Sequence, residues 1–397
     1  MSKQRKVFKF RMEPTALQSD ELLRMAGTAR FIWNWALDRC QTFYKENKKG
    51  ISQSHLSSEL TALKHRERWL YNFDSQSLQQ VLKDLKQAYE NHFDPKMRSG
   101  FPKFKTKKNP KQSFRIPQRV VLKNGGVYVP KLGWVKVRQS QAIDGQTRSA
   151  TLKRTATGKW YVALVTEFAL PEYKVSVAVA EVVGGDLGLG TYLTLSNGLE
   201  IENPRFLRQY AKKLRRGQRR LSRKLKGSRN RNKARVRVAT VYERIANLRG
   251  NFSHQLTHRR MQYPALCLEN LSILGLTKTK LAKSMLDAAF RQVLQQWKYK
   301  CVWNGTYALQ AERLFPSTQL CSHCRYQNKN LGLSDREWLC PECKVKHRRD
   351  HNAAQNLREE GIRQLVAMGI LETQNACGQP IRLATASMPG EAGIPRV

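Results

Sequence analysis

Acidic residues are scarce in this chain of 397 residues, where 30 Asp and Glu stand against 72 Lys and Arg and leave a formal charge of +42. Long apolar runs are also missing. The best candidate, residues 175–183, is short and contains Glu181, whereas a membrane helix needs about 18 apolar residues. The first residues, MSKQRKVFKFRMEP, are basic without the apolar stretch of a signal peptide. We therefore expect neither membrane insertion nor secretion, and a cytoplasmic location.

The shortage of acids also points to the kind of partner. A charge of +42 repels itself in a compact fold unless a polyanion neutralises it. The sequence has no long basic amphipathic anchor with an apolar face, so nucleic acid is favoured over a membrane surface as that polyanion. Because phosphate contacts release counterions, binding should be tight and sensitive to salt. The 40% apolar content excludes a wholly disordered basic tail, and the length predicts two or more domains.

The apolar pattern changes period along the first half of the chain. Residues 3–11 alternate and predict a basic strand. Helical spacing follows, with one face formed by Trp33, Leu37, Cys40 and Tyr44 and a second helix marked by Leu78, Leu82, Leu85 and Tyr89, with Asp74 or Ser75 as N-cap. Residues 114–170 alternate again and predict an antiparallel, barrel-like sheet. If the first strand joins that sheet, residues 14–100 are a helical insertion.

A third pattern begins near residue 180 and suggests alternating strands and helices. A strand, a Gly-rich break and a hairpin come first, and Asn197-Gly198 suits a type I′ turn. The segments that follow are a helical stretch at 205–258, a buried strand at 263–269, a helix at 284–300 and a strand around 306–312. The tail after residue 376 is rich in Gly, Ala and Pro and is predicted to be disordered.

The cysteines are unevenly distributed. Cys267, in an apolar segment, is typical of a buried thiol in a reduced protein. Two CxxC pairs, with 15 residues between them, consist of Cys321, Cys324, Cys340 and Cys343. Such knuckles bind one tetrahedral Zn²⁺, and four thiolate ligands leave no open position, so the metal should be structural. The alternative of disulfides or uncomplexed thiols is disfavoured by CxxC geometry and a reducing compartment. His323 and His347 are not needed as ligands.

Three acids stand at the ends of predicted elements. Asp186 follows the strand EVVGG, Glu269 ends the apolar run ALCL, and Asp350 precedes HNAAQNL, where it suits a helix N-cap. Carboxylates that converge from such positions could hold two Mg²⁺ ions about 4 Å apart, the arrangement that hydrolyses phosphodiesters. Each acid also has an ordinary explanation, as a turn residue, an ion-paired strand end or a helix cap. Spacing alone does not decide between these interpretations.

The motifs in this order resemble the TnpB (OrfB) family of insertion-sequence proteins, which are relatives of type V CRISPR effector nucleases. The resemblance covers nearly the whole chain. It rests on the segments GGDLGLGTYLTLSNG, LSRKLKGSRNRNKARVRVATVYERIANLRGNFSHQL, LCLENLSILGL, LAKSMLDAAFRQVLQQWKYK, FPSTQLCSHC, REWLCPEC and DHNAAQNL, and more weakly on GFPKFK and PKLGWVKVR.

The resemblance implies a multidomain α+β architecture. A β-barrel wedge domain (1–13 and 101–178) holds an inserted helical recognition domain (14–100). An RNase H-like (RuvC) α/β nuclease domain (179–315 and 346–375) holds an inserted four-Cys zinc ribbon (316–345). The remaining residues, 376–397, form the tail. These assignments are expectations that the motifs carry over from the family.

The resemblance also implies a function and its cofactors. Members look like RNA-guided DNA endonucleases of transposable elements, which bind a guide RNA from the transposon end and cut double-stranded DNA beside a short adjacent motif. The implied ligands are Asp186, Glu269 and Asp350 for two catalytic Mg²⁺ ions and the four cysteines for one structural Zn²⁺. The implied location is the prokaryotic cytosol or nucleoid.

Backbone contacts with a guide–target heteroduplex would explain the charge without a base-reading motif. Residues 212–249 contain 16 Lys or Arg and one acid, Glu243, and predict a main contact surface. Its leading candidates are Lys212, Lys213, Arg215, Arg216, Arg219, Arg220, Arg223 and Lys224. Candidates for base contacts at the adjacent motif are Gln76, Gln79, Gln80 and the segment 112–118. A solvated charged helix is the ordinary alternative for the basic stretch.

Two positions depart from the family pattern. Arg348-Arg349-Asp350 stands where Asp-Arg-Asp is common, and Glu269-Asn270-Leu271 where Glu-Asp-Leu is common. Neither change removes an implied ligand, but both reduce the local negative charge. A catalytically weak or inactive RNA-guided DNA-binding regulator, or a transposition accessory protein, is therefore the alternative hypothesis. A general RNA-binding zinc-ribbon protein is the third.

Overall fold

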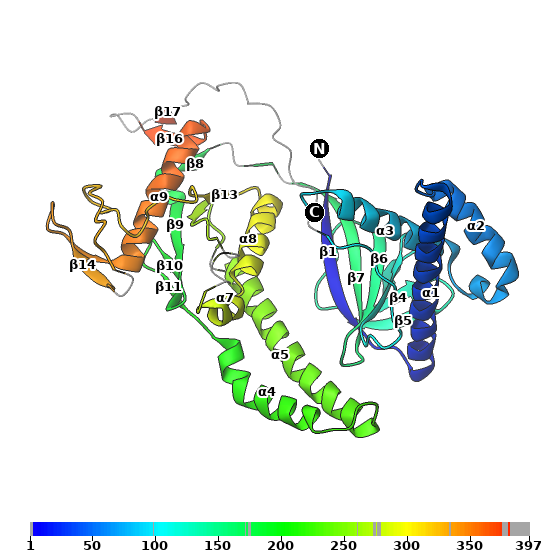
Figure 1. Ribbon diagram of the computed structural model, residues 1–397. Helices are drawn as coiled ribbons and strands as arrows, with labels where there is room; N and C mark the ends of the chain where they lie inside the picture. Colours follow the sequence, from blue (N-terminus) through cyan, green and yellow to red (C-terminus); the bar gives the residue numbers. More distant parts are fainter. Residues whose placement is uncertain are drawn as a thin grey trace. The chain divides into compact units, whose positions relative to one another are not determined.

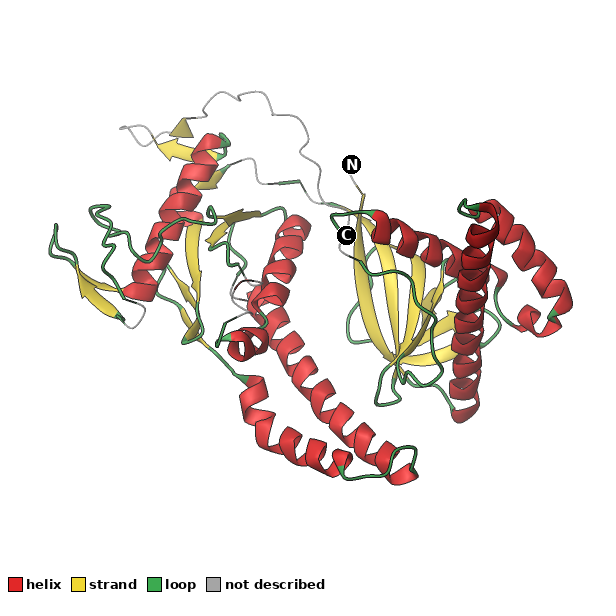
Figure 2. Ribbon diagram, viewed as in Figure 1, coloured by secondary structure: helices red, strands yellow, loops and turns green. Residues whose placement is uncertain are grey.

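The computed structural model describes residues 3–97, 99–170, 172–173, 176–259, 261–272, 275, 279–332, 335–374 and 380–381. The chain divides into two compact units. The first comprises Met1–Ala169 and Lys224–Thr240, and the second comprises Leu170–Arg223 and Val241–Val397. Both contain helices and strands, as a multidomain α+β protein requires (Figures 1 and 2). Apart from residues 380–381, the predicted tail 376–397 lies outside the described residues.

A seven-stranded antiparallel sheet forms the centre of the first unit. Its order is β2-β6-β7-β1-β5-β4-β3. The N-terminal strand pairs with β7, with Lys3 opposite Ala169, so the prediction of a strand at residues 3–11 is confirmed. The bounds are β1 Lys3–Met12, β2 Gln112–Ile116, β3 Val121–Lys123, β4 Gly126–Val129, β5 Gly133–Arg138, β6 Gln146–Arg154 and β7 Trp160–Ala169.

Three α-helices of this unit pack on one core with the sheet. They are α1 Ala16–Asn47, α2 Gln53–Arg66 and α3 Ser75–Phe93, with a 3₁₀ turn η1 at Arg68–Asn72. Asp74 is the N-cap of α3, where its side chain accepts a 2.8 Å hydrogen bond from the Ser77 amide. The predicted apolar face of α1 ends early, because Trp33 and Leu37 are buried whereas Tyr44 is 57% exposed.

A five-stranded sheet forms the centre of the second unit, in the order β11-β10-β9-β12-β13. β9 and β10 pair antiparallel, as do β10 and β11, whereas β12 runs parallel to both β9 and β13. The bounds are β9 Val182–Leu187, β10 Thr191–Leu195, β11 Glu200–Glu202, β12 Ala265–Leu268 and β13 Tyr307–Gln310. Smaller pairings join β8 Val177–Ala178, β16 Leu371–Gln374 and β17 Pro380–Ile381, and separately β14 Glu337–Leu339 with β15 Lys346–Arg348. A 3₁₀ turn, η2, spans Val179–Glu181.

Helices cover both faces of this sheet, and the strand residues alternate accordingly. Val182 and Cys267 belong to the core cluster beneath α9, whereas Val183 and Leu266 belong to the cluster that contains α8. The bounds are α7 Ala282–Ala288, α8 Phe290–Asn304 and α9 Arg349–Ala367 (Figure 1). α9 lies so close to β9 that a Cβ on Gly184 would collide with the Ala354 carbonyl.

Two stretches that the apolar periodicity predicted as single helices are each interrupted by a residue in the left-handed backbone conformation. The predicted helical stretch 205–258 is two helices, α4 Phe206–Ser222 and α5 Arg229–Arg259, with Gly227 at φ 87° between them. The predicted helix 284–300 is likewise α7 and α8, separated at Ala289 with φ 55°. Side-chain periodicity registers which face is apolar, so it does not detect a single residue that turns the backbone.

The predicted type I′ turn at Asn197-Gly198 is wrong. That turn needs positive φ at both central residues, and of these two only Gly198, at φ 85°, has it. The Gly198 amide instead donates to the Leu195 carbonyl, which places the glycine at the last position of its turn. The positive pair occurs at Asn124 and Gly125, between β3 and β4.

A search of the described helices for a candidate membrane span finds none with the length and apolar character that crossing would require.

Candidate functional site: paired carboxyls and a thiol cluster

Two of the three predicted acids follow neighbouring parallel strands. Asp186 is in β9, one residue from its end, and Glu269 comes directly after β12. The register pairs Leu268 with Gly185, so the next residues along the two strands are Glu269 and Asp186. Parallel strands bring their carboxyl ends to one sheet edge, which is where α/β folds place ligands. The sheet pairing therefore brings together two acids that lie far apart in the sequence.

The two carboxyls influence each other, because a hydrogen-bond contribution from Glu269 is among the causes of the raised pKa of Asp186. Asp186 is only 8% exposed. Burial, together with the charges of Glu269 and Asp350, raises the pKa of Asp186 to about 8, and the charge of Arg349 opposes this rise. Burial also raises the pKa of Glu269, while the hydrogen bond with Asp186 lowers it. Without a cation, the pair is thus expected to hold a proton on Asp186 at neutral pH.

Asp350 approaches this pair from α9. It lies in the first turn of a helix that begins at Arg349, so the predicted role of N-cap is wrong, and Arg348 occupies the cap position. An acid in a first turn faces the positive end of the helix dipole, which stabilises it there. Its Oδ1 lies 3.7 Å from Nη1 of Arg336. Asp350 is near enough to raise the pKa of Asp186.

The ligand atoms of the three acids are less tightly clustered than the sulfurs of the four cysteines. Among the described residues, one set of three or more potential ligands has its ligand atoms all within 4.8 Å of one another, and that set is the four cysteines. The three acids therefore do not converge as tightly as the thiols, and Asp350 is ion-paired with Arg336.

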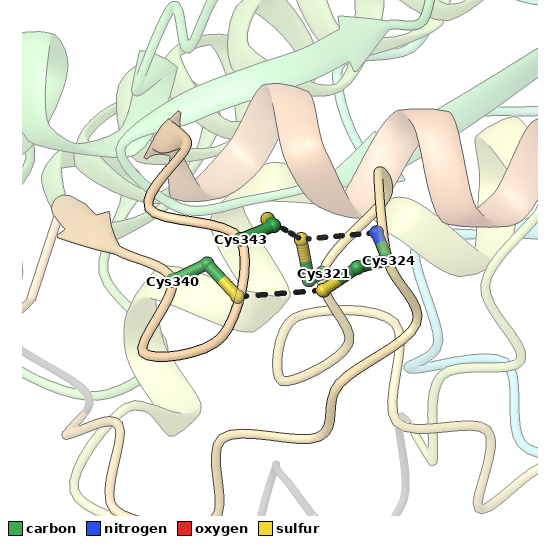
Figure 3. A group of neighbouring side chains, drawn as sticks. All are labelled: Cys321, Cys324, Cys340 and Cys343. Atoms are coloured by element: carbon green, nitrogen blue, oxygen red, sulfur yellow. Dashed lines mark hydrogen bonds between the residues drawn. The ribbon is translucent and has the colours of Figure 1, made fainter.

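The four cysteine sulfurs form a tight cluster (Figure 3). Sγ of Cys321 lies 3.6 Å from Sγ of Cys343, and Sγ of Cys324 lies 3.5 Å from Sγ of Cys340. Ligands at the zinc–sulfur distance of about 2.3 Å in a tetrahedron stand about 3.8 Å apart. The four are thiols rather than disulfides. The donor set, its spacing and its oxidation state therefore fit one structural metal ion such as zinc.

His347 touches this cluster, which the spacing of the cysteines did not indicate. Its Nε2 lies 3.0 Å from Sγ of Cys321, and its ring packs 4.9 Å from that of Trp338. It is 7% exposed, whereas His323, inside the first knuckle, is exposed. A buried imidazole at this distance fits a hydrogen-bond partner of a ligand sulfur, the kind of contact that orients metal ligands.

Two asparagines that sequence reasoning missed hold the first knuckle against α9. Asn356 donates to the Ser317 and Leu320 carbonyls at 2.8 and 2.7 Å. Asn352 donates to Leu320 and accepts from the Ser322 amide at 2.9 Å. Both side chains are buried. Their spacing of four residues in HNAAQNL places them on one helix face, and buried amides so placed could have suggested a docking role.

The predicted nucleic-acid residues fall into two groups. All eight basic candidates, from Lys212 to Lys224, are exposed on α4 and the residues after it, where α4 buries only Leu214. Of the three glutamines of α3 that were predicted as base-contact candidates, Gln79 accepts a hydrogen bond from Ser57 and Gln80 donates to Asp84. Gln76 is exposed.

The two residues that depart from the family pattern, Arg348 and Asn270, and the neighbouring Arg349 adjoin the predicted acids in the sequence. Arg348 donates to Glu200 at 2.8 Å, and Arg349 donates to the Gly332 carbonyl at 2.7 Å. Asn270 is exposed next to Glu269. Arg348 thus neutralises an acid of β11, and Arg349 places its charge within reach of Asp186.

Comparison with known proteins identifies the family. Family models described as "Probable transposase" and "Cas12f1-like, TNB domain" match residues 169–280 and 290–357. A third, "Helix-turn-helix domain", matches residues 1–49, although the described part of that segment, residues 3–49, holds one strand and one long helix.

Relatives match over the whole length. A "Putative RNA-guided DNA endonuclease" of Streptomyces pristinaespiralis is 33% identical over 408 residues, which cover 100% of both chains. The "Putative RNA-guided DNA endonuclease InsQ" of Escherichia coli K12 is 31% identical over 97% of this chain and 98% of InsQ. The fold also resembles that in the "Cryo-EM structure of the Cas12f1-sgRNA-target DNA complex", with a TM-score of 0.52 and 15% identity over 90% of this chain and 99% of that one.

These matches define a transposase-related protein of insertion sequences. Within that class, the chain belongs to the TnpB (OrfB) family, and the resemblance inferred from its motifs is confirmed.

Proposed function

We propose that this protein is an RNA-guided DNA endonuclease of a transposable element, which hydrolyses DNA phosphodiesters with Mg²⁺ at sites chosen by guide pairing and a short adjacent motif. The observation that carries the proposal is the strand register that places buried Asp186 and half-buried Glu269 beside each other at the carboxyl edge of two parallel strands. Structural acids are rarely crowded together inside a chain of charge +42, and carboxyls with such raised pKa values cluster at functional sites.

The carboxyls suit divalent magnesium, which prefers oxygen ligands and completes its shell with water and phosphate. We assign Asp186, Glu269 and Asp350 as its ligands. Together the three carboxyls would hold two such ions, the number that phosphodiester-hydrolysing sites of this kind use. When bound, such ions supply an activated water and neutralise charge on the leaving oxygen.

The sheet supports a nuclease domain of the RNase H-like type. Three antiparallel strands, β9 to β11, continue into the parallel strands β12 and β13, and the acids lie at the edge where β9 and β12 end. The thiol cluster, inserted just before Asp350, is assigned to a structural Zn²⁺. The seven-stranded sheet and helices α1 to α3 are assigned to the wedge and recognition domains.

A guide RNA and a double-stranded DNA target are the partners we assign. The relatives carry names with this activity, and the structural neighbour is a complex with both nucleic acids. The exposed basic residues of α4 supply counter-charges for phosphates without reading sequence.

Plasmid cleavage with the copurified RNA tests the proposal. The guide sequence of that RNA identifies a matching plasmid, which is incubated with Mg²⁺ or with a chelator of divalent cations. Asp186→Asn should lower the cleavage rate about a thousandfold or more, because metal ligands supply several kcal/mol of transition-state stabilisation, and it should leave RNA copurification unchanged. Glu202→Gln, an exposed acid on the same sheet, is the matched control and should cut normally. Loss of RNA binding in Asp186→Asn would assign this acid a structural role.

A guided DNA-binding regulator that does not cut is the second candidate. Arg336 lies 3.7 Å from Asp350, and Arg349 acts on Asp186, so two cations compete with metal for the acids. This candidate predicts guide-dependent DNA binding with no Mg²⁺-dependent cleavage, and the same assay separates it from the first.

A further inference from the structure

The helical part of the first unit contains a pocket that the proposed chemistry does not use. It has a volume of about 880 Å³ and is lined by residues of α1, α2 and α3 and of the segments that follow α1 and α3. Buried leucines of α2 and α3, among them Leu56, Leu82 and Leu85, line its floor. Its volume falls in the range of small-molecule sites, which are mostly apolar with a few polar groups at defined positions.

Aromatic side chains also line the pocket, and three of them are exposed to solvent. Tyr44, Phe93 and Phe101 are 57%, 72% and 44% exposed. The rings of Tyr89 and Phe93 are nearly parallel, at 14° with centroids 6.4 Å apart, and Phe101 meets Tyr89 edge-on at 5.4 Å. Exposed aromatics that converge on one pocket are unusual on a soluble surface and mark binding sites.

The rim of the pocket is basic. Lys45 and Lys86 line it, and both are exposed. Lys48 and Lys49 follow on the same exposed segment, where Glu46 is the one acid of residues 41–53. Lys86 also lies 3.7 Å from Glu90. An apolar peptide would not interact with these cations. A nucleotide, in contrast, offers a π-face to the aromatic rings and a phosphate to the lysines.

We propose that this pocket binds an unpaired base of RNA, stacked on the exposed aromatic rings with its phosphate beside Lys45 and Lys86. This inference rests on the RNA partner of the proposed function. RNA is favoured because structured RNAs present unstacked bases in loops and ends, which proteins capture on aromatic side chains. The target strand of the DNA keeps its bases paired, first with the complement and then with the guide, whereas the displaced strand becomes unpaired only after a target is found, and the DNA arm of the test below distinguishes it from RNA.

Quenching of 2-aminopurine tests the proposal on the full-length protein. The probe is a short single-stranded RNA with one 2-aminopurine, because stacking on an aromatic ring quenches its fluorescence. Phe93→Ala and Tyr44→Ala should each weaken the quenched complex about 5- to 150-fold. Phe104→Ala is the matched control, since Phe104 is 54% exposed nearby but does not line the pocket, and it should behave as wild type. Circular dichroism verifies that the variants remain folded.

Three results would overturn the pocket assignment. Unchanged quenching in folded Phe93→Ala and Tyr44→Ala would exclude stacking there. Equal quenching of the matching DNA oligomer would exclude the choice of RNA. A concentration-dependent dimer that Phe93→Ala dissociates, with quenching unchanged, would show that a second copy fills the pocket. Asp186→Asn separates this inference from the proposed function: it should quench normally without cutting, whereas wild type that binds no RNA at all would refute the RNA partner itself.

Discussion

The thiol cluster and the carboxyl pair differ in how the chain assembles them. All four cysteines lie within residues 321–343, and their sulfurs already stand at distances of 3.5 and 3.6 Å that fit tetrahedral ligation. The acids come from β9, from the end of β12 and from the first turn of α9. Two of them are neighbours in the register of paired strands, and the third is ion-paired with Arg336. The first site is formed by a local hairpin, and the second by the pairing of distant strands.

Because the two sites are assembled differently, we expect the thiols to contribute to the stability of the fold and the acids to contribute to function. A metal that joins two knuckles holds together a segment with little core of its own, where Cys321, Trp338 and Cys340 are the buried members of one small cluster. The carboxyls sit at the edge of a sheet that already has cores on both faces. We therefore expect the fold to need the thiols, and to tolerate or even gain from loss of an acid.

The largest effect is expected from the thiols. Cys321→Ser should abolish zinc binding and expose residues 317–348 to amide exchange, since structural zinc contributes about 10–16 kcal/mol to small domains. Zinc content and hydrogen exchange measure the two effects. Cys40→Ser, at a half-buried thiol of the first unit, is the control and should keep both properties. If the amides around the cysteines stayed protected from hydrogen exchange in zinc-free Cys321→Ser, the expectation that the fold needs the thiols would be wrong.

Replacement of an acid is expected to have a smaller effect and to stabilise the fold instead of destabilising it. Because burial raises the pKa of Asp186 to about 8, the folded state keeps a proton that the unfolded chain loses above its ordinary value near 4. Without divalent cations, this group therefore destabilises the fold increasingly as pH rises from about 4 to about 8, and the penalty is then constant.

Asp186→Asn removes this penalty and keeps a donor for Glu269. Its melting temperature should exceed that of wild type by several degrees at pH 8, given that about 1 kcal/mol corresponds to 2–4 °C, and the gain should vanish towards pH 4. Thermal melts across this range in Mg²⁺-free buffer measure it. A gain that is the same at every pH would mean that the carboxyl charge is not its cause.

A moderate loss of local stability is expected when the first CxxC knuckle loses its hydrogen bonds to α9. Asn356→Ala leaves the buried Ser317 carbonyl without this donor, while the half-buried Leu320 carbonyl keeps the hydrogen bond from Asn352, and the loss costs about 1–3 kcal/mol. Amide exchange in the first knuckle should accelerate while zinc stays bound. Val366→Ala, at a 43% exposed position of the same helix, should leave exchange unchanged. Zinc loss in Asn356→Ala would mean that α9 shapes the thiol cluster itself.

The smallest effect is expected from Arg348→Ala. The Arg348–Glu200 pair is well exposed, with side chains 67% and 39% accessible, and exposed pairs contribute about 0–1 kcal/mol. The melting temperature should therefore change by no more than about 4 °C. A larger fall would show that Arg348 anchors the thiol hairpin to β11.

Local signals in the sequence predicted many of these features correctly. Alternation predicted the strand at β1, and Asp74 before an amphipathic run predicted the start of α3. The two CxxC pairs predicted which thiols meet. In each of these cases the determining groups lie within a few turns of chain, where residue type and spacing fix the outcome. The breaks at Gly227 and Ala289 were missed because one left-handed residue leaves no periodic trace.

Contacts between distant segments were harder to predict from the sequence. No pattern marks His347 as a partner of Cys321, or Asn356 as the support of a knuckle. Helix capping rules assigned Asp350 to the N-cap, but α9 begins earlier, at Arg349. The pairing of β9 with β12, which makes neighbours of Asp186 and Glu269, is fixed by a register that neither strand contains alone.

The sequence by itself determined the family, the basic charge and the four thiols of the cluster, because ordered motifs, composition and short-range spacing are properties of the linear chain. Only the tertiary structure decided that Asp186 is buried against Glu269 while Asp350 stays ion-paired beside them. Burial and the approach of like charges depend on which strands pair and which helix covers them, and these long-range choices set the protonation of the carboxyls.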